Sequence, residues 1–239
     1  MLKGYDMIIA GLCSFVSSST VSELQATAEE LKGFATHFRA KVWLGGTTPE
    51  KYMEGIGYNG ISYLEDINNS IATGTECHTP DHIKACDKLD FIWIGGRNSQ
   101  NYTLLGAASE HWGDVFIKRG FGMTIDETIG LYDIMNKIHR KEAFIIERGI
   151  NTFDRTPDSR WAPDLKGMIR IKHERPDMFE NMVVDLSHSV GKWEYIKDTY
   201  EAFKAIGVKH WMVECSASGH TDTDKGQHIT VRELKKIIR

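Results

Sequence analysis

The sequence predicts an α/β fold, a single (β/α)8 TIM barrel that occupies the whole chain. Its 239 residues are close to the roughly 250 of a typical barrel. Short apolar runs alternate with longer amphipathic stretches, a pattern typical of parallel strands joined by right-handed helical crossovers. Eight such runs are present, and this number favours a closed barrel over an open sheet. We therefore expect one domain, residues 1–239, without a regulatory extension.

Each expected strand is a short run rich in apolar residues. The eight candidates are residues 7–12, 41–45, 71–76, 91–96, 115–120, 143–149, 181–187 and 210–215. No GxGxxG triplet follows the first of them, which argues against a dinucleotide-binding Rossmann sheet. The parallel barrel therefore remains the predicted architecture.

Helical periodicity occupies the intervals between these strands. The stretch 20–38 is predicted to be a helix capped at Ser19 or Thr20, with Leu24, Ala28 and Leu31 at helical spacing. The stretch 192–207 ends at Gly207, a residue type that commonly follows a helix. Residues 150–176 are the least regular part and are expected to form the sixth crossover, partly as a functional loop.

Composition excludes several classes of protein. Hydrophobic residues make up 41% and charged residues 26% of the chain, enough apolar material for a large core. A net charge of −4 gives no basic face for nucleic acid. No run approaches the ~18 apolar residues that a membrane span needs. The four cysteines form no CxxC pair, which favours reduced thiols and a cytoplasmic location.

Polar residues gather just after the predicted strands, where the mouth of a barrel carries its active site. They are Cys13, Ser14, Thr75, Glu76, Arg97, Asn98, Lys118, Arg119, Glu147, Arg148, Asp185, His188 and Glu214.

Two subsets of these residues differ in chemistry. Arg97, Lys118 and Arg148 follow neighbouring strands and would repel one another unless an anion such as phosphate lay among them; pairing with Glu76 and Glu147 is the structural alternative. The second subset combines thiol, imidazole and carboxylate groups, the ligands of a divalent transition metal. It comprises Cys13, His188, Glu214 and Asp224.

At these residues the chain resembles the 3-deoxy-D-arabino-heptulosonate 7-phosphate (DAHP) synthases, in the branch that includes the 3-deoxy-D-manno-octulosonate 8-phosphate synthases. The similar runs are IAGLCS (9–14), GIGYNGISYL (55–64), IGGRNSQNYTLL (94–105), IKRGFGMTIDE (117–127), IERGINTF (146–153), VVDLSHSVGK (183–192) and VECSASGHTDTDKGQ (213–227). They occur in the order of the family and span nearly the whole chain.

This resemblance implies a condensation of phosphoenolpyruvate (PEP) with a phosphorylated aldose, which releases inorganic phosphate. It implies that Cys13, His188, Glu214 and Asp224 bind a divalent ion of the Mn, Fe, Co or Zn type, and that Arg97, Lys118 and Arg148 hold the PEP phosphate. Lys118, His188 and Cys13 are the expected catalytic residues, and Asn98, Glu76 and Asp185 are expected to contact substrate. By analogy, the chain is a homo-oligomer, expected to be a tetramer.

The chain departs from the family pattern after the second strand. The family carries an RGG segment and then KPR(T/S)S, which hold PEP and the aldose phosphate. Here Leu44 stands at the arginine of the RGG pattern, and the loop over 47–54 is shorter and lacks KPR. Two other readings therefore stay open: a metal-dependent lyase or aldolase acting on another phosphorylated compound, and a non-catalytic barrel.

Overall fold

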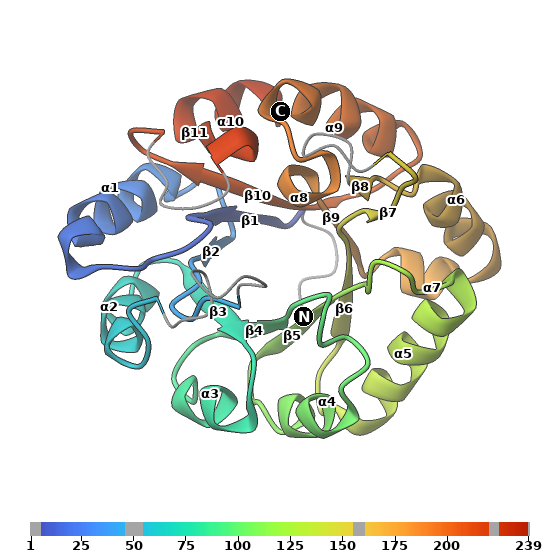
Figure 1. Cartoon of the computed structure of the whole chain (residues 1–239), viewed down its shortest axis with the longest axis horizontal. Helices are drawn as coiled ribbons and strands as arrows, with labels where there is room; N and C mark the ends of the chain where they lie inside the picture. The colour runs from blue at the N-terminus through green and yellow to red at the C-terminus, as the bar shows by residue number, and fades with distance from the viewer. Residues whose placement is uncertain (1–5, 46–54, 155–160, 220–224, 239) are drawn as a thin grey trace.

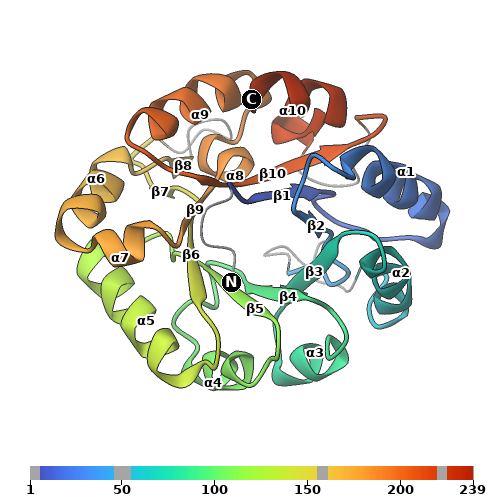
Figure 2. The same cartoon turned by 180° about the vertical axis from the view of Figure 1, so that it is seen from behind.

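Eight parallel strands form a closed ring, and helices surround it (Figures 1 and 2). The computed structural model describes residues 6–45, 55–154, 161–219 and 225–238. The ring strands are β1 (Ile8–Gly11), β2 (His37–Arg39), β3 (Ala72–Cys77), β4 (Phe91–Ile94), β5 (Asp114–Lys118), β6 (Ala143–Glu147), β9 (Met182–Asp185) and β10 (His210–Ser216).

The ring closes between its first and last strands. β1 pairs in parallel with β10 as well as with β2, with Ile8 opposite Trp211 and Gly11 opposite Glu214. All the other neighbouring pairs in the ring are parallel too. The predicted (β/α)8 barrel is therefore confirmed.

The crossovers between the strands are mainly helical. They contain α1 (Val21–Leu31), α2 (Asn59–Asn68), α3 (Pro80–Ala85), α4 (Tyr102–Ser109), α5 (Ile125–Ile138), α6 (Leu165–Glu174), α7 (Pro176–Phe179), α8 (Leu186–Val190) and α9 (Ile196–Ala205), and α10 (Val231–Ile237) follows the last ring strand. Short 3-10 turns lie at η1 (Ser18–Thr20), η3 (Trp193–Tyr195) and η4 (Lys225–Gln227).

Local sequence signals fix several helix ends. Thr124 and Glu127 form a capping box at the start of α5, in which each side chain binds the backbone N–H of the other residue. Thr20 is the N-cap residue of α1, one of the two predicted positions. After α9, Gly207 adopts a φ of +97°, as predicted for a glycine beyond a helix end.

The second strand was predicted in the wrong place. β2 covers His37–Arg39, not residues 41–45. The helix expected over 20–38 ends at Leu31, and Gly33 then adopts a φ of +70°. Because that left-handed conformation favours glycine, Gly33 ends the helical path and frees the following residues to enter the sheet. Within the described residues, Lys41 pairs with Ser14 in an isolated β-bridge instead of belonging to a strand.

The barrel interior is a separate apolar cluster, distinct from the layer between strands and helices. Successive side chains of a strand point to opposite faces, so Ile9 points inward while Ile8 and Ala10 pack towards helices. The interior cluster comprises Met7, Ile9, Phe91, Trp93, Phe116, Phe144, Ile146, Val183 and Met212. Its aromatic rings fill the lower part of the barrel, which is therefore a packed core and no channel.

Two short additions lie outside the ring. β7 (Ile150–Asn151) and β8 (Trp161–Ala162) form an antiparallel hairpin after β6, with Asn151 opposite Trp161. This hairpin lies in the irregular segment 150–176. β11 (Ile229–Thr230) pairs in parallel with the end of β10.

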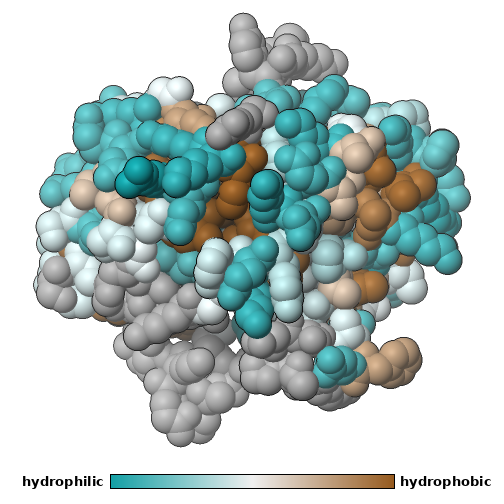
Figure 3. Space-filling model, turned by 90° about the horizontal axis from the view of Figure 1, so that it is seen from above, coloured by the Kyte–Doolittle hydropathy of each residue, from teal (hydrophilic) through white to brown (hydrophobic). Residues whose placement is uncertain are grey.

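The side of the molecule seen in Figure 3 is mostly polar. In the view of Figure 3, hydrophilic side chains cover most of the helical rim, and hydrophobic side chains show in smaller areas between them. No helix in the described part of the chain has the length and apolar character needed to cross a membrane.

We predict that Gly11→Ala destabilises the fold by roughly 2–4 kcal/mol. Gly11 has a φ of +145°, and a Cβ there would lie 2.2 Å from the carbonyl oxygen of Arg39 on the next strand. Gly106→Ala is the matched control, because nothing lies within 4 Å of its added Cβ. Alanine stabilises a helix by about 0.5–1 kcal/mol relative to glycine, so this variant should not lose stability. Denaturant unfolding of both variants measures the difference, and equal stability of the two would contradict the prediction.

A second prediction concerns acid stability. Burial at the base of the barrel, with His210 nearby, lowers the pKa of His37 to about 4 from 6.5. The unfolded chain therefore binds more protons between these values, so the contribution of His37 is complete above pH 6.5 and declines by roughly 3 kcal/mol as the pH falls to 4. His37→Phe keeps a ring against Phe91 and Phe116, and its unfolding free energy should fall less steeply over this range. Parallel slopes would refute this role of His37.

Candidate active site at the barrel mouth

The polar residues of the mouth continue the inward-facing rows of the strands. Lys118 follows Phe116 by two positions, Asp185 follows Val183, and Glu214 follows Met212. Since side chains alternate along a strand, each of these polar residues points into the barrel above the apolar base. These three residues of the predicted rim therefore face the barrel axis at its mouth.

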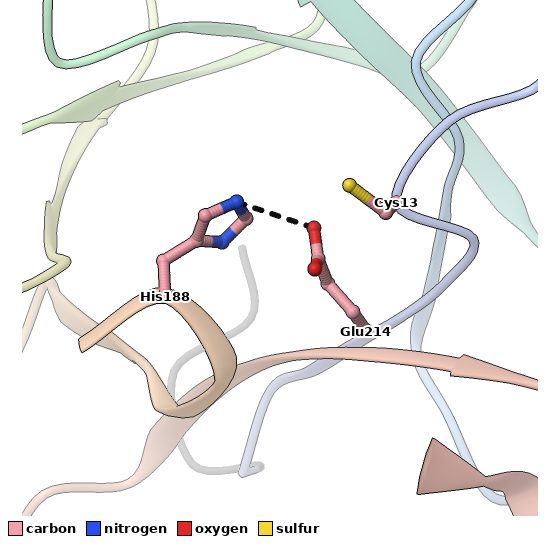
Figure 4. Close-up of side chains that lie close together, drawn as sticks. All are labelled: Cys13, His188 and Glu214. Carbon is pink, nitrogen blue, oxygen red and sulfur yellow. Dashed lines mark ion pairs between the residues drawn. The ribbon is translucent and has the colours of Figure 1, made fainter. Parts of the chain in front are cut away.

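Cys13, His188 and Glu214 lie together at this mouth (Figure 4). A donor atom from each, a sulfur, an imidazole nitrogen and a carboxylate oxygen, lies within 4.8 Å of the other two. Cys13 follows β1, His188 lies in α8 and Glu214 belongs to β10. The closure of β1 against β10 therefore brings together residues from the two ends of the chain.

Asp185 and Lys118 position the imidazole of His188. Asp185 caps α8, since its Oδ1 accepts from the backbone N–H of His188 at 3.0 Å, and its Oδ2 lies 2.8 Å from Nδ1 of the same residue. Nζ of Lys118 donates to Oδ2 at 2.7 Å. A carboxylate only accepts, so Nδ1 carries the proton, and Nε2 faces Glu214 at 3.3 Å.

The electrostatics of this cluster keep its carboxylates ionised. Burial opposes ionisation of Glu214, but His188 and the Arg39 guanidinium lower its pKa far below the usual range. Asp185 behaves likewise, because His188 and Lys118 outweigh its burial and lower its pKa. Burial lowers the pKa of His188 despite the opposing carboxylates of Asp185 and Glu214.

The three donors fit a divalent transition metal. Oε1 of Glu214 is buried and accepts no hydrogen bond within the described residues, although Gln227 donates to Oε2 at 2.7 Å. Nδ1 of His188, the ring nitrogen that faces away from Glu214, is hydrogen-bonded to the carboxylate of Asp185, as in many metal-binding histidines. Asp224, the fourth expected ligand, lies outside the described residues.

Arg39 is a site residue that the sequence analysis missed. It ends β2, is fully buried, and places Nη2 3.1 Å from Glu214 Oε1 and 3.3 Å from the carbonyl oxygen of Cys13. Its Nε and Nη1 find no hydrogen-bond acceptor among the described residues, and its guanidinium lies over Trp93. An arginine does therefore stand at the end of the second strand, whereas Leu44 lies beyond it. Gly33 was the sequence signal that would have found it.

The two expected phosphate arginines share one aromatic ring. The guanidinium carbons of Arg148 and Arg97 lie 4.6 and 5.9 Å from the ring centre of Phe121. Arg148 is buried, and Arg97 is exposed and donates to the carbonyl oxygen of Gly45 at 3.1 Å. Lys118 is instead held by Asp185, so it connects this group to the metal-type cluster.

Two charged residues beside the mouth, Arg119 and Glu147, point away from the barrel axis and form a structural ion pair. Arg119 and Glu147 follow the outward-facing rows of β5 and β6, and their side chains pair at 2.9 Å. Arg119 also pairs with Asp164 at 2.7 Å. Glu147 therefore pairs with Arg119. These contacts do not support the alternative in which Glu147 pairs with Arg97, Lys118 and Arg148.

The other expected substrate residues lie at the same mouth. Glu76 belongs to β3 and lies 3.9 Å from His78. Despite its burial, His78, Lys41 and other cations lower the pKa of Glu76 to about 2. Asn98 lies in the turn after β4, where its backbone N–H donates to Gly95 at 2.8 Å. Both residues lie where the sequence placed them, and their contact with a substrate stays a prediction.

A closed barrel with thiol, imidazole and carboxylate donors beside buried cations defines a TIM-barrel protein with a candidate metal site at its mouth. The profile of the DAHP synthetase I family matches residues 2–238, and the chain belongs to that family. The phospho-2-dehydro-3-deoxyheptonate aldolase of Thermotoga maritima is 30% identical over 244 residues, which cover 99% of this chain and 68% of that protein.

Solved structures agree with this assignment. The crystal structure of phospho-2-dehydro-3-deoxyheptonate aldolase (DAHP synthase) from Thermotoga maritima matches with a TM-score of 0.86 and 27% identity, over 99% of this chain and 67% of that one. A truncated form of 3-deoxy-D-arabino-heptulosonate 7-phosphate synthase from the same organism gives 0.82 and 26%, over 98% and 84%. The family resemblance seen in the sequence is thereby confirmed.

We predict that Cys13→Ala weakens Co²⁺ binding by more than about 100-fold and removes thiolate-to-cobalt absorption, because a ligand is lost outright and even outer contacts matter 10–100-fold. Cys215→Ala is the control. Cys215 is the neighbour of Glu214 on the other face of β10, and burial raises its pKa to about 12, so its thiol stays protonated. Absorption that survives in Cys13→Ala, or that vanishes in Cys215→Ala, would contradict this ligand set.

Proposed function

We propose that this chain is a DAHP synthase-like transferase that condenses PEP with a phosphorylated aldose and releases inorganic phosphate in a metal-dependent reaction. The observation that carries the proposal is the joining of the Cys13, His188 and Glu214 cluster to a set of buried cations at one mouth. Family membership and the similarity to the Thermotoga maritima enzymes support the same chemistry.

The cations of the mouth are assigned to PEP. Arg148, Arg97 and Lys118 would hold the phosphate, whose oxygens suit the paired donors of a guanidinium. Arg39 takes the position at the end of strand two that the resemblance gives to the RGG arginine, and its buried Nε–H and Nη1 are available to an anionic group. Arg39 thus supports PEP binding, whereas an alignment that places Leu44 at the RGG arginine does not.

Cys13, His188 and Glu214 would hold the divalent ion, with Asp224 as the expected fourth ligand. When bound, such an ion supplies Lewis-acid polarisation of the aldose carbonyl. Asp185 keeps Nδ1 of His188 protonated and its ring oriented, so that Nε2 is directed to the cluster. Lys118, held between Asp185 and the phosphate side, connects the two halves of the site.

In the proposed reaction, C3 of PEP forms a bond to the aldehyde carbon of the aldose, whose oxygen takes up a proton. Water adds to C2 of PEP, and the bond from C2 to the phosphate oxygen breaks, so that the ketone forms and inorganic phosphate leaves. Arg148, Arg97 and Lys118 stabilise the charge that develops on the departing phosphate. A small phosphorylated sugar is therefore the expected second substrate.

The test measures phosphate release from PEP by metal-reconstituted protein, with a panel of four- to six-carbon aldose phosphates. We expect one aldose phosphate to be required, and His188→Ala to reduce the rate by at least about 100-fold, the scale of losing a transition-state interaction. Cys215→Ala again serves as the control. No release with any aldose, while PEP still binds, would overturn the synthase and favour a lyase or aldolase acting on another phosphorylated compound.

A further inference from the structure

The hairpin β7–β8 places an indole ring at the phosphate side of the mouth. Trp161 on β8 stacks on Phe121, with ring centres 4.2 Å apart and planes 19° apart. The guanidinium carbon of Arg148 lies 4.7 Å from the indole centre and 4.6 Å from the Phe121 centre. One cation therefore contacts two stacked rings.

Backbone contacts hold this pair of rings in place. The N–H of Asn151 on β7 donates to the carbonyl oxygen of Phe121 at 3.0 Å, which ties the hairpin to the loop after β5. Between β6 and β7, Gly149 adopts a φ of +91°, and a Cβ added there would lie 3.1 Å from Cβ of Trp161. The chain thus turns directly beside Arg148 and leaves room for the indole.

We infer that Trp161 is a positioning residue, which together with Phe121 holds the Arg148 guanidinium ready for a phosphate group. A ring face attracts a guanidinium while leaving its N–H donors, which lie in the guanidinium plane, available for oxygen acceptors. The carboxylate beside Arg148 in sequence, Glu147, is turned outward and bound by Arg119.

The stacked rings also offset the repulsion between the positive charges of Arg148 and its neighbours. Arg97 approaches the same Phe121 ring at 5.9 Å, so two guanidinium groups lie near one ring. Without a bound anion, a long arginine side chain would turn away from such neighbours. The stacked rings hold it over the mouth, so less conformational freedom is lost when phosphate binds.

The inference rests on the proposed phosphate role of Arg148, and a double-mutant cycle tests it apart from turnover. Calorimetry gives the Kd of inorganic phosphate and of PEP for the wild type, Trp161→Leu, Trp161→Phe, Arg148→Ala and the Trp161→Leu/Arg148→Ala double variant. We expect Trp161→Leu to weaken both by about tenfold, the scale of one desolvated cation–π contact. Trp161→Phe should stay within about threefold of the wild type, since it keeps a ring.

The decisive comparison is the Arg148→Ala background. If Trp161 acts through Arg148, adding Trp161→Leu to Arg148→Ala changes neither the Kd of phosphate nor that of PEP any further. Trp112→Leu is the matched control, because it removes a similar contact, with Lys141 at 5.0 Å, before the start of β5 and away from the mouth. Thermal unfolding of each variant shows that the fold is retained.

Two outcomes would overturn the inference: wild-type affinity in Trp161→Leu, or the same loss with and without Arg148. Failure of the wild type to bind phosphate or PEP would overturn it together with the proposed function. Binding of PEP that follows the expected cycle, without phosphate release from any aldose, would contradict the proposed reaction alone.

Discussion

The alternation of side chains along a closed parallel barrel is the constraint on which the rest of the structure depends. Every ring strand has both faces buried, one towards the helices and one towards the barrel axis. A residue's parity along its strand therefore decides whether it packs, pairs or faces the mouth. Lys118 and Arg119 are adjacent in sequence, yet one joins the site and the other forms a buried pair with Glu147.

Charge balance at the mouth follows from the same constraint. Buried ions are costly unless they are paired, and the carboxylates of Glu214 and Asp185 each lie against a cation from another strand, Arg39 and Lys118. The phosphate side is organised differently, because aromatic faces accompany its arginines. One half of the mouth thus consists of opposite charges in contact, and the other brings arginines against aromatic rings.

The sequence predicted most of the ring but not its second strand. Seven strands were placed within a few residues, because most of them are short apolar runs bounded by polar residues. β2 is three residues long and contains His37 and Arg39, so it lacks that signal, and the preceding helical pattern was extended through it. Gly33 marked the true end of the helix.

The candidate site shows the same division. Cys13, His188, Glu214 and Asp224 were predicted as a set, because barrel closure makes the first and last strands neighbours. The structure brings the first three together, and Asp224 lies outside the described residues. Trp161 could not be predicted, since its position depends on a hairpin with two residues in each strand. A contact across such a hairpin leaves no periodic pattern in the sequence.

The seam between β1 and β10 has a consequence for how the protein is made. Met7 donates to a ring nitrogen of His210, 203 residues away along the chain, and Cys13 meets Glu214 across the same seam. A nascent chain in which β10 has not yet been synthesised contains only the β1 side of these contacts. Contacts of such long range form late in folding, so the candidate metal cluster should assemble only after β10 has been synthesised and has joined β1.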